Sequence, residues 1–148
     1  MSTTTTPRLL RAALLALALG AQAAIAATIT VNSLADTVAN DGACTLREAI
    51  TAANTDAVSG VAAGECAAGA GSDAIAFSVA GTIQPASQLP IITTPIHIDG
   101  YTAPGASKNT LPLAQGTNAV LRIEIDGVNA GNFPGLNLTG ATASGSII

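Results

Sequence analysis

Four side chains able to do chemistry occupy matching places in two similar short segments. The sequences Ile-His-Ile-Asp-Gly and Ile-Glu-Ile-Asp-Gly recur at an offset of 27 residues and carry His97, Asp99, Glu124 and Asp126. Alternation predicts two strands whose polar side chains lie opposite the isoleucines. If the strands stack, His97 lies beside Glu124 and Asp99 beside Asp126. Clustered carboxylates serve polysaccharide lyases and hydrolases, alone or through Ca²⁺. These four residues are therefore the candidate glycan or calcium face.

A plainer interpretation gives the same four residues structural roles. Asp99 and Asp126 then close Asp-Gly turns, and His97 and Glu124 form an exposed cross-strand pair. The sequence has no G-x-S-x-G elbow and no phosphate-binding glycine loop before a helix. Its two cysteines and single histidine do not complete a four-ligand zinc site without a carboxylate. We expect no catalytic residue and no cofactor, with Ca²⁺ as the one alternative.

The first 26 residues have the features of a secretory signal peptide. Arg8 and Arg11 precede an uncharged apolar run, and Ala24–Ala26 is a small-x-small cleavage site, with Ala21–Ala23 as an alternative. The run is shorter than the roughly 20 residues that a transmembrane helix needs. We therefore expect a secreted or cell-surface protein without a membrane span after cleavage.

The composition of the chain excludes some classes of partner and favours one type of architecture. Cleavage leaves Arg47, Lys108 and Arg122 as the three basic residues against nine acidic ones, a net charge of −6. Nucleic acids and anionic lipids need basic clusters, so neither is an expected partner. Charged residues make up 9% of the chain and aromatic residues 2%. Many small and β-branched residues with frequent glycines favour narrow, stacked β-structure.

A short amphipathic helix is predicted from Thr45 to about Asn54. Thr45 and Glu48 have the spacing of a capping box, in which each side chain satisfies a backbone N–H at the helix start. An apolar stripe follows at helical spacing. Its members are Leu46, Ala49, Ile50 and Ala53. Arg47 lies off this stripe, where it pairs with Glu48, with Asp41 or with nothing.

The two cysteines, Cys44 and Cys66, predict one disulfide, because exported proteins fold in an oxidising compartment. The bond would close a loop rich in alanine and glycine and stabilise it by about 3 kcal/mol. Two free thiols are the alternative.

The repeat predicts the fold class. Alternation indicates further short strands at Thr28–Val31, Asp73–Phe77 and Gly81–Gln84. Strands that recur at a fixed period with turns between them indicate a solenoid, here a parallel β-helix in which Ile96 lies over Ile123. An immunoglobulin-like sandwich is the main competitor, but such domains usually bury a Trp and this chain has none.

Cys44–Ile50 together with Ala53-Asn54 resembles the CSLREA-type N-terminal segment of exported bacterial proteins, with Thr45 in place of the usual Ser. The similarity runs from about Ile29 to Gly127. It includes Ile29–Ser33, Asp41-Gly42, Cys66, Gly71–Asp73, Gly81–Ile83, Leu89–Ile91 and Ile98–Gly100. The resemblance implies an all-β fold, the start of a right-handed, pectate-lyase-like parallel β-helix with a short N-terminal capping α-helix. It carries over no catalytic residue.

These observations predict three parts of the chain. Residues 1–26 form the signal peptide, residues 27–90 the N-terminal cap with the helix and the disulfide loop, and residues 91–148 the first β-helix coils. The coils look incomplete, because the sequence ends in the apolar pair Ile147-Ile148.

The predicted function is non-enzymatic: the capping region and first coils of a secreted or cell-surface β-helix protein that adheres to a glycan or a partner protein. The alternative is the N-terminal part of a polysaccharide lyase or hydrolase whose catalytic coils lie downstream. A small self-contained interaction domain, such as an inhibitor, is the third class.

Overall fold

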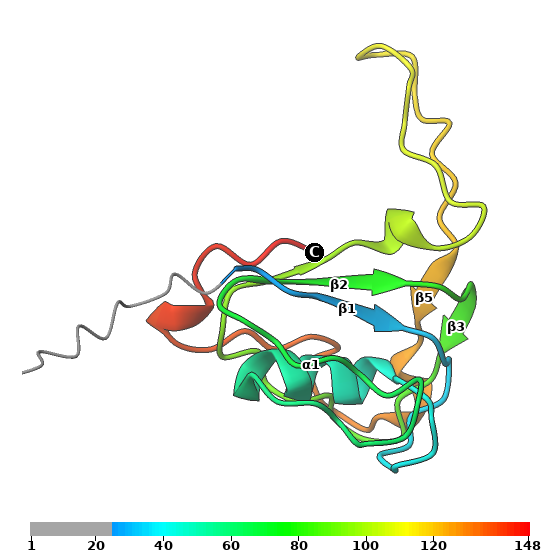
Figure 1. Cartoon of the computed structure of the whole chain (residues 1–148). Coiled ribbons are helices and arrows are strands. Elements are labelled where there is room, and N and C mark those ends of the chain that lie inside the picture. The colour runs from blue at the N-terminus through cyan, green and yellow to red at the C-terminus, as the bar shows by residue number, and fades with distance from the viewer. Residues whose placement is uncertain (1–24) are drawn as a thin grey trace, which may run out of the picture.

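A computed structural model describes residues 25–148, so the predicted signal peptide lies outside the described residues except for Ile25 and Ala26. One helix and five short strands make up the fold (Figure 1). In chain order they are β1 (Thr28–Val31), α1 (Leu46–Thr55), β2 (Asp73–Phe77), β3 (Gly81–Ile83), β4 (Ile96–Ile98) and β5 (Ile123–Ile125). Three single 3₁₀ turns follow β4: η1 (Gly100–Thr102), η2 (Gly127–Asn129) and η3 (Ala141–Ala143).

The strands form two parallel sheets. The first has the order β1-β2-β4, and the second pairs β3 with β5. In the first sheet Val31 lies opposite Phe77 and Ala74 opposite His97, and in the second Ile83 lies opposite Ile125. A single parallel bridge brings the C-terminal segment to β4, at Ile147. Every strand thus pairs with a segment distant in the sequence.

The prediction of an all-β, right-handed parallel β-helix is wrong. The described chain is a small mixed α/β structure with few short strands and one helix, and no solenoid is seen. The two repeat copies do not stack on each other: Ile96 pairs with Asp73 in one sheet, whereas Ile123 pairs with Gly81 in the other. The copies share a local conformation, a strand followed by a 3₁₀ turn. Similar local sequence fixed that conformation but not the strand partner.

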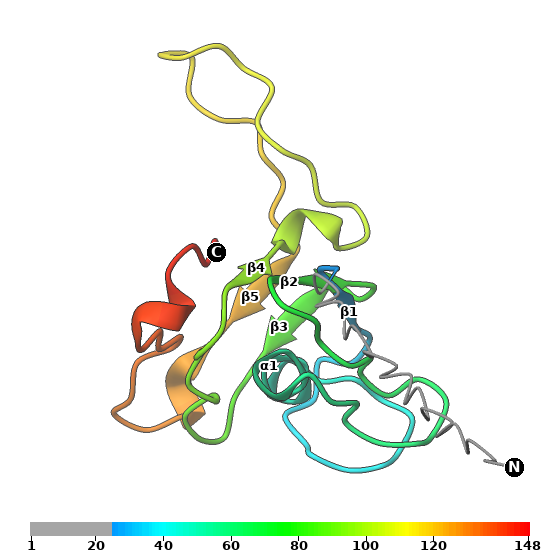
Figure 2. The ribbon, with the colours of Figure 1, turned by 60° about the vertical axis from the view of Figure 1, so that its left-hand side comes forward.

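The helix α1 covers one face of β1 and β2 (Figures 1 and 2). The predicted stripe of Leu46, Ala49, Ile50 and Ala53 is fully buried. From the sheet, Ile29, Val31, Ile75 and Phe77 close the same core. Burial of these aliphatic side chains is the main stabilising contribution to the fold, at about 1.5–3 kcal/mol for each large one.

The predicted capping box is present at the start of α1. Thr45 Oγ1 accepts a hydrogen bond from the Glu48 N–H, and Glu48 Oε2 accepts one from the Thr45 N–H at 3.0 Å. Glu48 Oε1 also accepts from the Ala39 N–H at 3.0 Å, so this buried carboxylate joins the preceding loop to the helix. The helix ends at Asp56, which adopts the left-handed conformation typical of a C-cap.

The predicted disulfide between Cys44 and Cys66 is confirmed, and both residues are buried. It joins the residue before the helix cap to the loop of residues 56–72. The side chain of Asn32 supports the same junction. Its Nδ2 donates to the Gly64 carbonyl at 2.7 Å, and its Oδ1 accepts from the Cys44 N–H at 2.7 Å. Gly64 has φ of +103°, and a Cβ there would lie 2.1 Å from the Gly42 carbonyl oxygen, so this close approach requires glycine.

A long loop between β4 and β5 projects from the body of the protein (yellow in Figure 1). Two antiparallel hydrogen bonds between Ser107 and Val120, of 3.0 and 2.9 Å, hold its base together. Among residues 25–148, no helix has the length and apolar character needed to cross a bilayer.

Candidate functional site

The four residues of the predicted glycan or calcium face do not stack in the expected pairs. His97 lies on β4 opposite Ala74, with Ile147 on its other side. Glu124 lies on β5 opposite Thr82, whose hydroxyl donates to Glu124 Oε2 at 3.1 Å. The expected stacking of His97 on Glu124 fails because β4 and β5 belong to different sheets.

Asp99 and Asp126 have the turn-closing roles of the plainer interpretation. Asp99 Oδ1 accepts from the Tyr101 N–H at 2.9 Å, and Asp126 Oδ1 accepts from the Val128 N–H at 3.0 Å. Each aspartate therefore caps the 3₁₀ turn that follows its strand. Within residues 25–148, no three His, Cys, Asp or Glu side chains are grouped so that they could hold a metal ion.

Two surface carboxylates have pKa values below their ordinary range. The Ser59 hydroxyl, followed by the Gly42 N–H, lowers the pKa of Glu65 from its usual 4.5. The Gln84 amide, followed by the Val128 N–H, lowers the pKa of Asp126 from its usual 3.8. These hydrogen bonds favour the charged form of each group.

The lowered pKa of Glu65 predicts how the stability of the fold depends on pH in acid. A carboxylate whose pKa is lowered on folding stabilises the folded state above the unfolded-state pKa, and the effect is lost as pH falls through the folded-state pKa. Stability should therefore fall as pH drops below about 4.5, the ordinary value for Glu65. Urea unfolding across pH 2.5–7 measures this, with a shallower acid limb expected for both Glu65→Gln and Ser59→Ala. Profiles for these variants that run parallel to the wild type would contradict the assignment.

An open cavity of about 630 Å³ lies between β4 and β5 and is here called the β4–β5 groove. Its wall is mainly aliphatic and aromatic. The apolar lining residues are Phe77, Ile98, Leu121, Ile123, Ile125, Leu136, Ile147 and Ile148. Three of them, Leu121, Ile147 and Ile148, are exposed. A concave surface with a mainly apolar lining is a candidate binding site.

Polar side chains border the groove on one side. Lys108 Nζ lies 5.6 Å from the centre of the Tyr101 ring, which places a cation over an aromatic face. Arg122 Nε donates to the Gly105 carbonyl at 3.2 Å, so this guanidinium is held at the base of the projecting loop. His97 and Asp99 also line the groove. No sequence pattern indicated this site, because strands of two different sheets build it.

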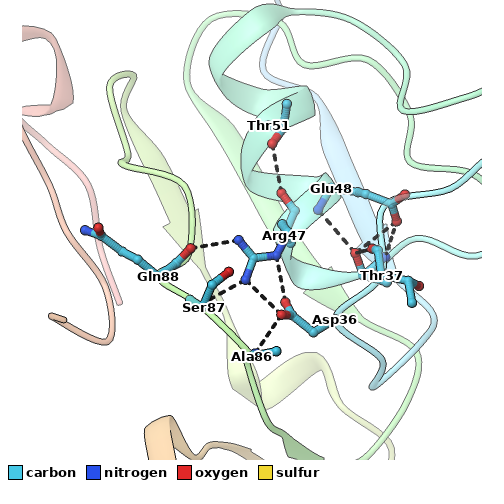
Figure 3. Close-up of polar contacts among 9 residues, drawn as sticks. Asp36, Thr37, Arg47, Glu48, Thr51, Ala86, Ser87 and Gln88 are labelled. Atoms are coloured by element: carbon cyan, nitrogen blue, oxygen red, sulfur yellow. Dashed lines mark hydrogen bonds and ion pairs between the residues drawn. The ribbon is translucent and has the colours of Figure 1, made fainter. Parts of the chain in front are cut away.

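Arg47 forms a second polar cluster, shown in Figure 3. Its predicted partners, Glu48 and Asp41, are wrong: the guanidinium bonds both carboxylate oxygens of Asp36, Nε to Oδ1 at 2.9 Å and Nη2 to Oδ2 at 2.8 Å. It also donates to the carbonyls of Gln88 at 2.7 Å and Ser87 at 3.1 Å. This cluster ties the helix to two loops and leaves little of the guanidinium for a ligand.

No family model, curated protein or solved structure matches the chain. The resemblance to CSLREA-type segments therefore stays a prediction.

Proposed function

We propose that this chain is an exported, non-enzymatic binding protein, secreted or held at the cell surface, that takes an extended apolar segment of a partner protein into the β4–β5 groove. The signal-peptide pattern of residues 1–26 and the Cys44–Cys66 disulfide support export. The observation that carries the binding role is the apolar wall of the groove beside an unpaired strand edge.

The edge of β5 supports an extended peptide as the ligand. Among residues 25–148, β3 is the only strand hydrogen-bonded to β5. That ladder uses the Arg122 carbonyl and the Asp126 N–H, so the backbone groups of Ile123 and Ile125 point to the opposite edge. The side chains of the same two isoleucines line the groove. A partner strand would find backbone hydrogen bonds and apolar contacts together, as in recognition by strand addition.

Basic side chains in the groove favour a partner that carries negative charge. Lys108 and Arg122 are two of the three basic residues that follow residue 26, and both line it. In a chain that is otherwise acidic, they favour a partner segment with an acidic residue next to its apolar stretch. A glycan is less suited to this wall, since Tyr101 is the one partly exposed aromatic side chain in it.

Binding of defined peptides to the exported protein tests this function. Ten-residue peptides of alternating valine and threonine, with or without a terminal Asp-Asp pair, would be titrated by calorimetry against the wild type and two matched variants. Leu121 and Val128 are each 72% exposed, but only Leu121 lines the groove. Leu121→Asp should weaken binding about tenfold or more, the effect of removing an apolar anchor, whereas Val128→Asp should leave the affinity unchanged.

Equal affinities for the two variants would contradict the assignment of the groove. Failure of every peptide to bind, or binding of oligosaccharides in their place, would overturn the proposed ligand class.

A further inference from the structure

Ala27 and Asp73 meet where the described fold begins. The Ala27 backbone nitrogen lies 3.1 Å from Asp73 Oδ1. Ala27 is also the residue that the predicted cleavage after Ala26 would expose as a new N-terminus. We propose that this cleavage creates an α-ammonium group at Ala27 that pairs with the buried carboxylate of Asp73 and anchors β1 in the sheet. The inference rests on the export that we propose above.

Asp73 is an unusual residue for its position. It begins β2 and is 1% exposed. Its Oδ1 accepts hydrogen bonds from the N–H groups of Ala27 and Ala70, but Oδ2 is buried and has no partner among the described residues. A buried carboxylate oxygen without a donor is strongly destabilising, so such a group calls for a cation or a further donor.

Among the described residues, no side-chain cation pairs with Asp73. Within residues 25–148 the one ion pair joins Arg47 to Asp36. Lys108 lies over Tyr101, and Arg122 donates to the Gly105 carbonyl.

The surroundings of the carboxylate are also tightly packed. A Cβ at Gly69 would lie 2.5 Å from Asp73 Oδ2 and 2.9 Å from the Ala52 carbonyl oxygen. This packing leaves no space for a side chain at position 69. The start of β1 offers a different approach, because the Ala27 nitrogen already contacts the Asp73 carboxylate.

Cleavage supplies such a group without moving the backbone. Hydrolysis of the Ala26–Ala27 peptide bond adds the water oxygen and one hydrogen to the Ala26 carboxyl and the other hydrogen to the Ala27 nitrogen, which takes a further proton at neutral pH. The neutral amide, with one N–H, becomes an ammonium group with three. One proton keeps the bond to Oδ1, and the others are available to Oδ2. Charge-assisted bonds of this kind are shorter and stronger than neutral ones.

The position of the scissile bond agrees with this role. Ile25 is 86% exposed and Ala26 is exposed, and neither belongs to a strand. The Ala27 carbonyl accepts from the Ala74 N–H at 2.8 Å, so the sheet contacts start at Ala27 itself. The sheet contacts therefore begin directly after the predicted Ala26–Ala27 cleavage site, and the exposed residues Ile25 and Ala26 lie directly before it. This boundary favours cleavage after Ala26 over the alternative site after Ala23.

The first measurement is the intact mass of the protein exported from the full-length gene, which gives the cleavage site. A mass that starts at Ala27 is expected. An uncleaved chain would overturn both export and the pairing, whereas export with a start at Ala24 would leave the binding function intact and overturn the pairing alone.

The second measurement is the reactivity of the amine. The mature chain carries two kinds of amine, the Ala27 α-amine and Lys108, so Lys108 serves as the internal reference for an acetylating reagent near neutral pH. A neighbouring carboxylate holds an amine in its protonated, unreactive form, so Asp73→Asn should speed acetylation of Ala27 about tenfold. The exposed Asp56→Asn should leave the rate unchanged. Equal rates in wild type and Asp73→Asn would overturn the pairing.

The third measurement keeps the test valid if Asp73→Asn folds poorly. A chain that retains the single extra residue Ala26 has an amide at Ala27 and the wild-type Asp73. It should melt about 5 °C or more below the chain that starts at Ala27. Where Asp73→Asn does fold, the same extension should have no effect on its melting temperature. Identical melting temperatures for the extended and mature wild-type chains would count against the pairing.

Discussion

Replacement of Arg47 by alanine is expected to lower the free energy of unfolding by about 3 kcal/mol, the cost of removing one partner from a largely buried ion pair. The side chains of Arg47 and Asp36 are only 14% and 10% exposed, so water replaces few of the lost contacts. The variant leaves the Asp36 carboxylate with the Ala86 N–H as its remaining donor and strips a donor from the Ser87 and Gln88 carbonyls (Figure 3). Urea denaturation at neutral pH measures the loss.

Three further variants test how the Arg47 side chain stabilises the fold. Arg47→Lys keeps the charge but not the paired N–H groups and should recover less than half of the loss. Thr51→Ala, one turn along the same helix and exposed, should change stability by less than about 0.5 kcal/mol. The double variant Asp36→Ala with Arg47→Ala should be more stable than the sum of the single losses predicts. Additive losses would show that the two side chains act independently.

Loss of the Cys44–Cys66 disulfide is expected to destabilise the fold by about 2–5 kcal/mol, the range for small exported domains. The bond ties the start of α1 to the loop of residues 56–72, which contains few large side chains to hold it. Thermal unfolding of Cys44→Ala/Cys66→Ala, compared with wild type with and without reductant, measures the loss.

The reductant provides the matched control for this prediction. Reduction should lower the melting temperature of the wild type to that of the double variant and should leave the double variant unchanged. A wild type that melts equally with and without reductant, with its thiols shown to be free, would contradict a stabilising role for the bond.

The local elements of this fold could be predicted from the sequence. Thr45 and Glu48 lie within one helical turn, so their spacing alone specifies the cap, and the apolar stripe behind them specifies the buried face. The disulfide followed from the presence of two cysteines in a chain that the sequence predicts to be exported. The strands at β1, β2 and β4 followed from alternation over three to five residues.

The arrangement of those elements could not be predicted. Similar local patterns at β4 and β5 gave each segment the same strand and turn, but their partners, β2 and β3, come from segments without the repeat. Pairing depends on how the whole chain buries its apolar faces, which a repeat over five residues does not encode. The partner of Arg47 was missed for the same reason, since Asp36 lies in an irregular loop. The β4–β5 groove exists only after both sheets have formed.

The parallel pairing of these sheets has a consequence for the speed of folding. Thr28 pairs with Ala74 and Gly81 with Ile123, so each pairing closes a long stretch of chain before any contact stabilises it. Chains dominated by such distant contacts fold slowly, in milliseconds to seconds. The Cys44–Cys66 bond lies between β1 and β2 in the sequence and shortens the path that joins them. If this bond forms early, the pairing of β1 with β2 closes a shorter loop and has a lower entropic cost.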